Sequence, residues 1–426
     1  MSEYLKSPLM GQMMDQPLLI SSIIVHADRH YGSNEIVSRR IEGDIHRYTY
    51  SDCHKRSRQL ANALTTFGVK MGDRVATMAW NGYRHLEAYF AVSGSGAVLH
   101  TINPRLHPDH IAYIANHAED QYLFFDATFL PLIEAAAPMC KTIKGFVLMC
   151  DRDRMPAQCK IPNLLCYEDL INASSDQYEW PLFDENSASS LCYTSGTTGN
   201  PKGALYSHRS TLLHSYASIS PNALNISARD TVLPVVPMFH VNAWGLPYSA
   251  PMVGAKLVLP GSQLDGKSVY DLYEQEKVTF SAGVPTVWLG LLNHVSQNDL
   301  TFSTLKRTII GGSACPPAMM KTFRDQYGVD VVHAWGMTET SPIASTCTLS
   351  AADLLLSIDE QAELRTTVGQ INFGVECRVV EPDTINPVAW DGETSGELQC
   401  SGPWIAANYY NDDRSAESFT SDGWLR

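Results

Sequence analysis

The chain has 426 residues, of which 44% are hydrophobic and 18% charged, so it can bury a large core and is long enough for several subdomains. Its 45 acidic and 31 basic side chains give a formal net charge of −14, which argues against nucleic acid as a partner because nucleic-acid-binding proteins need a basic face. No apolar run approaches the roughly eighteen residues of a membrane span, and no signal peptide is recognisable. The ten cysteines include no Cys-x-x-Cys pair, so we expect no zinc site, reduced thiols and a cytoplasmic protein.

Helical and extended patterns alternate up to residue 340, as in doubly wound α/β proteins. The spacing of apolar residues predicts helices over 50–67 and 85–93. Short buried strands are predicted at 73–79, 97–100, 121–125, 144–149, 188–193, 231–236, 255–259, 308–310 and 329–333. Beyond residue 341 the pattern changes, and 367–371, 376–381 and 396–400 alternate like antiparallel strands.

The run Tyr193–Gly203 reads Tyr-Thr-Ser-Gly-Thr-Thr-Gly-Asn-Pro-Lys-Gly and follows a predicted strand. It combines hydroxyl side chains, glycines and one lysine: Thr194, Ser195, Gly196, Thr197, Thr198, Gly199 and Lys202. Glycines let a backbone approach a ligand, consecutive N–H groups and hydroxyls form an anion-binding concavity, and a lysine adds a positive charge suited to phosphate. The run therefore predicts a phosphate-binding loop. It is not a Walker loop, because Pro201 precedes the lysine and Gly203 follows it.

Further motifs follow in order along the chain. They are Pro237–Trp244 (Pro-Met-Phe-His-Val-Asn-Ala-Trp), Gly311–Pro317 (Gly-Gly-Ser-Ala-Cys-Pro-Pro), His333–Thr340 (His-Ala-Trp-Gly-Met-Thr-Glu-Thr), Gly396–Leu398 and Gly402–Tyr410. Together with the phosphate loop they resemble the adenylate-forming enzymes: acyl-CoA synthetases, luciferases and the adenylation domains of peptide synthetases. The resemblance covers essentially the whole chain, and its details are most similar to bacterial medium- and long-chain fatty acyl-CoA synthetases.

This resemblance implies an α/β fold with two doubly wound α/β subdomains and a small distorted β-barrel layer. We expect the first α/β layer over 75–220, the second over 20–74 together with 230–340, and the barrel-like layer over 341–426. The segment Ser421–Arg426 resembles a sequence that, in the family, runs into an aspartate that binds ribose. We therefore expect this chain to be the large N-terminal domain, without the small C-terminal domain and its catalytic lysine.

The resemblance also implies the substrates ATP, a fatty acid and coenzyme A, with Mg²⁺ as cofactor. The loop with Lys202 would hold the β- and γ-phosphates. Glu339 matches the family's magnesium ligand, together with a loop threonine, Thr194 or Thr197, and Thr338 matches a residue near the α-phosphate. The other predicted ATP-binding residues are Gly312, Ser313, Ala314, His333, Ala334, Trp335, Gly336 and Met337.

For the acyl side, His240 matches the family's histidine beside the reacting carboxylate, and Trp244 matches a tryptophan that gates the acyl tunnel. If Asn242 starts a helix, these two side chains share a helical face. The predicted acyl-binding residues are His240, Trp244, Val284, Gly311, Gly312 and Trp335, of which Trp335 also resembles the platform on which adenine stacks. The predicted catalytic residues are Lys202, His240, Thr338 and Glu339.

Several alternatives stay open at this point. Amino-acid adenylation is disfavoured, because those domains commonly place Asp where this chain has His240. A ligase for an aryl acid, or for a short thioether acid such as 3-methylthiopropionate, is compatible with the motifs, because the sequence does not give the depth of the pocket. A non-enzymatic fragment that binds nucleotide and acyl adenylate is a further reading, and a homodimer through the N-terminal domain is neither favoured nor excluded.

Overall fold

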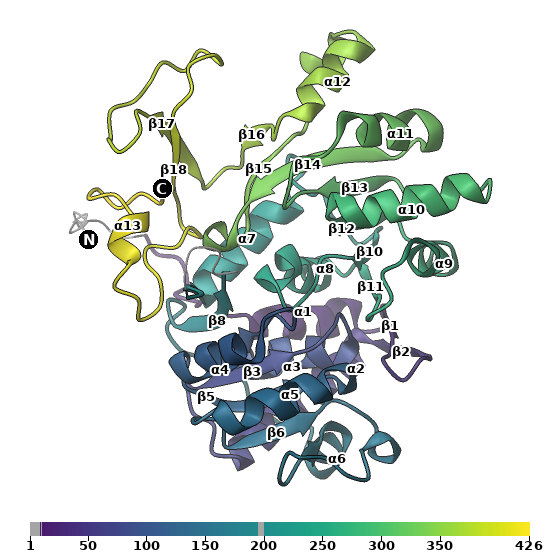
Figure 1. The fold of residues 1–426 in the computed structure, drawn as a ribbon, viewed down its shortest axis with the longest axis vertical. Helices are drawn as coiled ribbons and strands as arrows, with labels where there is room; N and C mark the ends of the chain where they lie inside the picture. Colours follow the sequence, from purple (N-terminus) through teal and green to yellow (C-terminus); the bar gives the residue numbers. More distant parts are fainter. Residues whose placement is uncertain (1–8, 10, 195–199) are drawn as a thin grey trace.

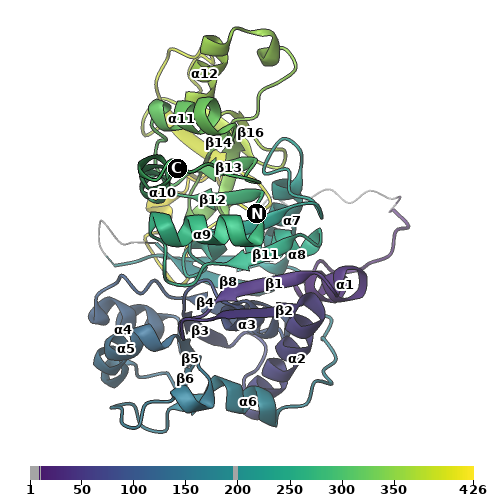
Figure 2. The ribbon, with the colours of Figure 1, turned by 90° about the vertical axis from the view of Figure 1, so that its right-hand side faces the viewer.

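Two large β-sheets occupy the two halves of the molecule. The computed structural model describes residues 9, 11–194 and 200–426. Figures 1 and 2 both place β3, β5 and β6 in one half and β12, β13 and β14 in the other.

The first sheet has seven strands in the order β7-β6-β5-β3-β4-β8-β9. Its strands are β3 (Arg74–Met78), β4 (Val98–Thr101), β5 (Asp120–Phe125), β6 (Gly145–Leu148), β7 (Leu165–Cys166), β8 (Ala188–Tyr193) and β9 (Gly203–Ser207). Neighbouring strands are parallel except β8 and β9, which form an antiparallel hairpin.

The second sheet has nine strands in the order β16-β15-β14-β13-β12-β10-β11-β1-β2. Its strands are β1 (Glu35–Arg39), β2 (Ile45–Thr49), β10 (Thr231–Pro234), β11 (Lys256–Leu259), β12 (Phe280–Gly283), β13 (Arg307–Ile310), β14 (Asp330–Gly336), β15 (Ile343–Thr346) and β16 (Gln370–Ile371). The central strands from β14 to β1 are parallel, whereas β2, β15 and β16 add antiparallel edges.

Helices cover the outer faces of the sheets and fill the space between them. The outer face of the first sheet packs on α4 (Pro108–His117) and α5 (Leu130–Ala136), and that of the second on α9 (Gly266–Glu276), α10 (Pro285–Gln297) and α11 (Pro317–Tyr327). The core between the sheets takes residues from α1 (Ser21–Tyr31), α2 (Tyr50–Thr66), α3 (Tyr83–Gly94) and α8 (Leu246–Met252). Remaining helices are α6 (Tyr167–Ala173), α7 (His208–Ile219), α12 (Ile358–Thr366) and α13 (Ser415–Ser418). Short 3₁₀ segments are η1 (Ala127–Phe129), η2 (Ala137–Met139), η3 (Arg152–Arg154), η4 (Val241–Gly245), η5 (Thr338–Thr340) and η6 (Asp353–Leu355).

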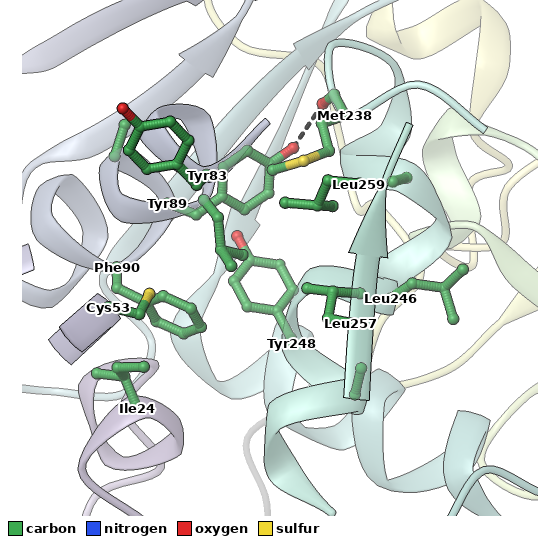
Figure 3. Close-up of a cluster of buried hydrophobic side chains, with 14 of the residues drawn as sticks. Ile24, Cys53, Tyr83, Tyr89, Phe90, Met238, Leu246, Tyr248, Leu257 and Leu259 are labelled. Carbon is green, nitrogen blue, oxygen red and sulfur yellow. Dashed lines mark hydrogen bonds between the residues drawn. The ribbon is translucent and has the colours of Figure 1, made fainter. Parts of the chain in front are cut away.

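Strand periodicity explains this layered arrangement. Successive side chains of a strand point to opposite faces, so Ile36 joins the core between the sheets while Val37 joins the outer core. Figure 3 shows the central cluster, in which the buried Tyr89 hydroxyl donates a hydrogen bond to the Met238 carbonyl. Tyr248 lies beside this pair, so α3 and α8 meet in one core. The two predicted α/β layers are confirmed.

The region after residue 341 divides between two sheets. β15 and β16 extend the edge of the nine-stranded sheet, whereas β17 (Glu376–Val380) and β18 (Glu397–Ser401) form a separate antiparallel ribbon. The antiparallel character predicted for 367–371, 376–381 and 396–400 is therefore confirmed, while the exact subdomain boundaries stay a prediction. Among the helices in the described ranges, none is long and apolar enough to cross a bilayer.

Candidate active site

The predicted site residues lie where strands of both sheets end. Thr194 follows β8 of the first sheet, and the motif Pro237–Trp244 begins shortly after β10 of the second. Val284 follows β12, Gly311 follows β13, and Trp335 stands near the end of β14. Ligands of open α/β sheets bind in the crevice outside the carboxyl ends of the strands, so these positions have a common physical reason.

A cavity of about 350 Å³ brings most of these residues together. Its lining consists of Thr194, His240, Val241, Trp244, Ile309, Gly311, Gly312, Ala334, Trp335, Gly336, Met337, Thr338, Glu339, Pro342 and Ile343. The cavity therefore brings the start of the predicted phosphate loop, the predicted magnesium ligand and predicted acyl-binding residues into one space. We call it the first cavity.

The phosphate loop connects the two strands of the β8–β9 hairpin. Tyr193 pairs with Gly203, and the next pair closes the base: the Thr194 N–H donates to the Lys202 carbonyl at 2.9 Å, and the Lys202 N–H donates to the Thr194 hydroxyl at 3.2 Å. Ser195, Gly196, Thr197, Thr198 and Gly199 lie outside the described residues. The loop thus follows a strand, as predicted, but it leads into an antiparallel strand.

Lys202 and Glu339 both contact Tyr409, which the sequence analysis had assigned no role. The Tyr409 hydroxyl donates to a carboxylate oxygen of the buried Glu339, and the Lys202 ammonium lies 4.8 Å from the centre of the Tyr409 ring. The ammonium also donates to the Ser418 hydroxyl at 3.2 Å. One tyrosine therefore links the predicted phosphate lysine with the predicted magnesium ligand.

Backbone contacts hold Glu339 and Thr338 between two further segments. The Tyr206 hydroxyl donates to the Thr338 carbonyl at 2.5 Å, so the hairpin that carries the loop is tied to this motif. On the other side, the Ala406 N–H donates to the Glu339 carbonyl at 2.8 Å. The motif Gly402–Tyr410 was visible in the sequence, but nothing in its spacing showed that it folds against Glu339.

Magnesium ions prefer one or two carboxylates, with the remaining ligands from phosphates and water. Glu339 and Thr194 line the same cavity, and both supply oxygen ligands. Within the described ranges, no group of three or more His, Cys, Asp or Glu side chains is placed to hold a metal. The residues present therefore fit a magnesium ion that arrives with a polyphosphate better than a cation bound by protein ligands alone.

Gly311 and Gly312 allow the Trp244 ring to approach the end of β13. A Cβ atom on Gly311 would lie 3.0 Å from the Ala334 carbonyl oxygen and 3.2 Å from the Trp244 ring. At Gly312, φ is +77°, a conformation that glycine adopts without strain, and a Cβ there would meet Val284 at 3.3 Å. The two glycines therefore let the Trp244 ring and Val284 pack directly against the end of β13.

Among the described residues, four predicted ATP-binding residues lie outside the lining of the first cavity: Lys202, Ser313, Ala314 and His333. Ser313 and Ala314 are exposed just beyond it. His333 is buried, and its Nδ1 lies 3.0 Å from the Thr367 carbonyl, while its Nε2 accepts from the Cys315 N–H at 3.4 Å. Both ring nitrogens are therefore occupied by backbone contacts, through which His333 connects β14 to the segments at Cys315 and Thr367.

The segment after His240 does not start a right-handed helix. Val241, Asn242, Ala243 and Trp244 all have positive φ, between 46° and 57°, and the right-handed helix α8 begins only at Leu246. His240 and Trp244 therefore do not share a face of a right-handed helix, because the backbone from Val241 to Trp244 is left-handed and precedes α8. Such a run is rare for residues with a side chain, since each costs about 1–2 kcal/mol.

Buried hydrogen bonds from Asn242 support this left-handed turn. Its Nδ2 donates to the Ser190 hydroxyl at 2.9 Å, and its Oδ1 accepts from the Tyr89 hydroxyl at 3.2 Å. Ser190 is on β8 and Tyr89 on α3, so the amide ties the turn to both elements. Asparagine also tolerates the left-handed region better than most residues.

A second cavity, of about 370 Å³, adjoins the first. Its lining consists of Trp80, Asn103, Arg105, Val235, Val236, Pro237, Phe239, His240, Trp244, Leu264, Val284, Val287 and Gly312. His240, Trp244 and Gly312 line both cavities, so they form the boundary between them. Most of the second lining is apolar, with Arg105 as a charged residue exposed to solvent.

His240 lies at the boundary between the two cavities, and its pKa is lowered there. Solvent reaches its ring, yet the protein around it disfavours the charged form, and the nearby Arg105 adds repulsion, so both effects lower its pKa. A neutral imidazole beside the boundary can accept or donate a hydrogen bond at neutral pH.

Comparison with known proteins agrees with this geometry. The sequence profile described as AMP-binding enzyme matches residues 25–410. The chain belongs to this family. The 3-methylmercaptopropionyl-CoA ligase of Ruegeria lacuscaerulensis is 50% identical over 417 residues, which cover 98% of this chain and 77% of the relative. The medium-chain-fatty-acid–CoA ligase of Ectopseudomonas oleovorans is also 50% identical, over 98% of this chain and 76% of the relative.

A solved structure confirms the fold of this AMP-binding enzyme. The anthranilate CoA ligase AuaEII, solved with anthranoyl-AMP, superposes with a TM-score of 0.84 over 96% of this chain and 75% of that chain, at 22% sequence identity. Together with the sequence profile and the two relatives, this confirms the resemblance to adenylate-forming enzymes. The individual roles of the site residues stay predictions.

Proposed function

We propose that this AMP-binding enzyme is an ATP-dependent acyl-CoA ligase for aliphatic carboxylic acids, with medium-chain fatty acids as its principal substrates. The observation that carries the proposal is the pair of adjoining cavities. The first contains Thr194, at the start of the phosphate loop, and Glu339, and the second is mainly apolar. A substrate that spans the boundary would place an anionic group on one side and an alkyl tail on the other.

The reaction class follows from what the residues on each side can do. A carboxylate attacks the α-phosphorus of ATP, and both reactants are anionic, so the site must neutralise charge and align the two groups. Lys202, at the C-terminal end of the phosphate loop, would hold the β- and γ-phosphates. The neutral His240 lies where the carboxylate would cross from one cavity to the other.

Glu339 would supply the carboxylate ligand for Mg²⁺, which when bound neutralises charge on the phosphate oxygens. Tyr409 holds that carboxylate in place through its hydroxyl. The acyl adenylate formed in this way would then be attacked by the thiol of coenzyme A, and AMP would leave.

The first test is calorimetric binding of non-hydrolysable acyl-AMP mimics with tails of three to sixteen carbons and one aryl tail. Affinity that rises with tail length to a plateau supports an alkyl tunnel and gives its depth. Tightest binding of the aryl tail would refute the aliphatic assignment.

Two matched substitutions, one just before α10 and one on it, test whether the tail enters the second cavity. Val284 precedes the helix and lines the second cavity, whereas Leu289 is 55% exposed on the outer surface of α10. Val284→Phe should shift the affinity plateau to shorter tails, because the added ring fills that cavity. Leu289→Phe adds similar bulk outside the cavity and should leave the dependence of affinity on tail length unchanged. If Val284→Phe also leaves that dependence unchanged, the tail does not enter the second cavity.

A short thioether acid is the second candidate substrate. It is favoured by the 50% identity to the 3-methylmercaptopropionyl-CoA ligase of Ruegeria lacuscaerulensis. Under this alternative, a three-carbon thioether tail would bind as tightly as an eight-carbon tail. Exchange of pyrophosphate into ATP in the presence of each acid distinguishes catalysis from binding alone, because a chain that only binds the mimics supports no exchange.

A further inference from the structure

Two cysteines face each other across the β17–β18 ribbon, outside both cavities. Cys377 is the register partner of Cys400, and their Sγ atoms lie 3.2 Å apart. Both thiols are free. Cys400 is buried and Cys377 is half-buried, so small solutes reach the pair from the Cys377 side.

Backbone hydrogen bonds define the geometry of this pair. The Cys400 N–H donates to the Leu425 carbonyl at 2.8 Å, and the Leu425 N–H donates back to the Cys400 carbonyl at 2.9 Å. A residue of an antiparallel strand directs its N–H and C=O to the same side, so Cys400 turns both groups away from β17. Cys377 and Cys400 therefore form a non-hydrogen-bonded pair, in which Cα atoms approach to about 4.5 Å. That separation lies within the range of about 4.4–6.8 Å found for disulfides.

We propose that Cys377 and Cys400 form a redox modification site, which hydrogen peroxide converts to a reversible disulfide. The required movement is small, because the sulfur atoms need to approach from 3.2 Å to about 2.0 Å. The hydrogen bond from the Cys377 thiol favours the charged form of Cys400 and lowers the pKa of Cys400. Since the thiolate is the reactive form, Cys400 is the sulfur that reacts first.

The chemistry balances with one molecule of peroxide. The Cys400 thiolate attacks a peroxide oxygen, the O–O bond breaks, and the departing hydroxide takes up a proton to become water. The Cys377 sulfur then attacks the resulting sulfenic acid, the S–O bond breaks, and a second hydroxide leaves with the Cys377 proton as water. Two thiols lose two electrons and two protons, and the peroxide is reduced to two waters.

The bridge would clamp the base of an exposed loop. The segment between the two strands runs from residue 381 to residue 396 and includes Trp390, which is 75% exposed. β18 continues into the segment whose Ala406 contacts Glu339, so the β17–β18 ribbon joined by the disulfide lies next to the candidate active site in the chain. Oxidation should therefore slow amide hydrogen exchange in β17 and β18.

The test is mass spectrometry of the whole chain after graded treatment with hydrogen peroxide. Free thiols are alkylated, and the protein is digested without reduction. We expect a peptide pair joined through Cys377 and Cys400, lighter by two hydrogens and separated by dithiothreitol. If all ten cysteines are alkylated, or if only other cysteines are linked, the proposal is wrong.

Single substitutions test the order of the steps in folded protein, verified by circular dichroism. In Cys377→Ser the sulfenic acid on Cys400 cannot be resolved, so dimedone should label Cys400 far more than in the unmodified sequence. The slower amide exchange after peroxide should also be lost. Cys150→Ser is the matched control, because Cys150 is a buried thiol whose carbonyl lies 3.4 Å from the Cys166 sulfur, and this variant should keep the bridge. Equal dimedone labelling of Cys400 with and without Cys377 would overturn the mechanism.

Discussion

Replacing Asn242 should destabilise the protein, because this residue supports the left-handed turn between the two cavities. The loss in the free energy of unfolding has two parts, lost hydrogen bonds and backbone strain. In Asn242→Ala the two buried neutral hydrogen bonds to Ser190 and Tyr89 are lost at about 1 kcal/mol each, together with a weak, long contact from the Cys192 thiol. Alanine at φ = 50° adds about 1 kcal/mol, because a Cβ is disfavoured in the left-handed region and asparagine tolerates it. The expected loss in the free energy of unfolding is therefore about 3 kcal/mol, the sum of these contributions.

Asn242→Gly separates the two contributions. Glycine loses the same hydrogen bonds but accepts the left-handed backbone, so it should cost about 1 kcal/mol less than alanine. Tyr89→Phe keeps the turn but removes the hydroxyl shared by the Met238 carbonyl and the Asn242 amide oxygen, and we expect a loss of about 1–3 kcal/mol. Urea denaturation of the three variants gives the differences, provided that the slope of the transition is unchanged.

The same variants report on function, because Trp244 is part of this turn. Binding of a long-tailed acyl-AMP mimic should weaken in Asn242→Ala, while binding of ATP alone should change little. If glycine destabilises the protein as much as alanine does, the left-handed backbone is not what the asparagine supports. If the free energies of unfolding of Asn242→Ala and Asn242→Gly both stay within about 0.5 kcal/mol of that of the unmodified protein, the reasoning about the buried amide is refuted as well.

Four further substitutions test the predicted roles of site residues. Lys202→Ala should weaken binding of ATP and pyrophosphate at least tenfold, since a charged hydrogen bond contributes about 1.5–3 kcal/mol, and should spare AMP; an equal loss for AMP would contradict a role at the outer phosphates. Glu339→Gln should abolish the magnesium dependence of ATP binding in calorimetry, and an unchanged dependence would remove this assignment. Tyr409→Phe should weaken magnesium-dependent ATP binding less than Glu339→Gln does, by about 1 kcal/mol, because the carboxylate loses one hydrogen bond; no change would show that Tyr409 does not orient Glu339. Trp244→Ala should alter the tail-length preference for acyl-AMP mimics with nearly intact ATP affinity, whereas loss of ATP binding would make this tryptophan structural.

The sequence alone was enough to locate most strands and the chemical character of the site. Strand periodicity and the position of turn residues are local properties, so the segments at 121–125, 188–193 and 308–310 were predicted to within a residue of the observed strands. A phosphate-binding loop could be predicted because the residues suited to that chemistry lie in one continuous run, from Thr194 to Lys202. The sequence motifs along the whole chain also identified the family, which the sequence profile confirms.

Contacts between distant segments could be decided only by the tertiary structure. Tyr409 meets Glu339 from 70 residues away, and Cys377 meets Cys400 only because β17 and β18 pair in one register. The condition that Asn242 starts a right-handed helix is not met, because the left-handed backbone of Val241–Trp244 depends on the Asn242 amide reaching β8 and α3. Local sequence preferences act over a few neighbouring residues, whereas buried hydrogen bonds of this kind form only once both sheets have packed around the same core.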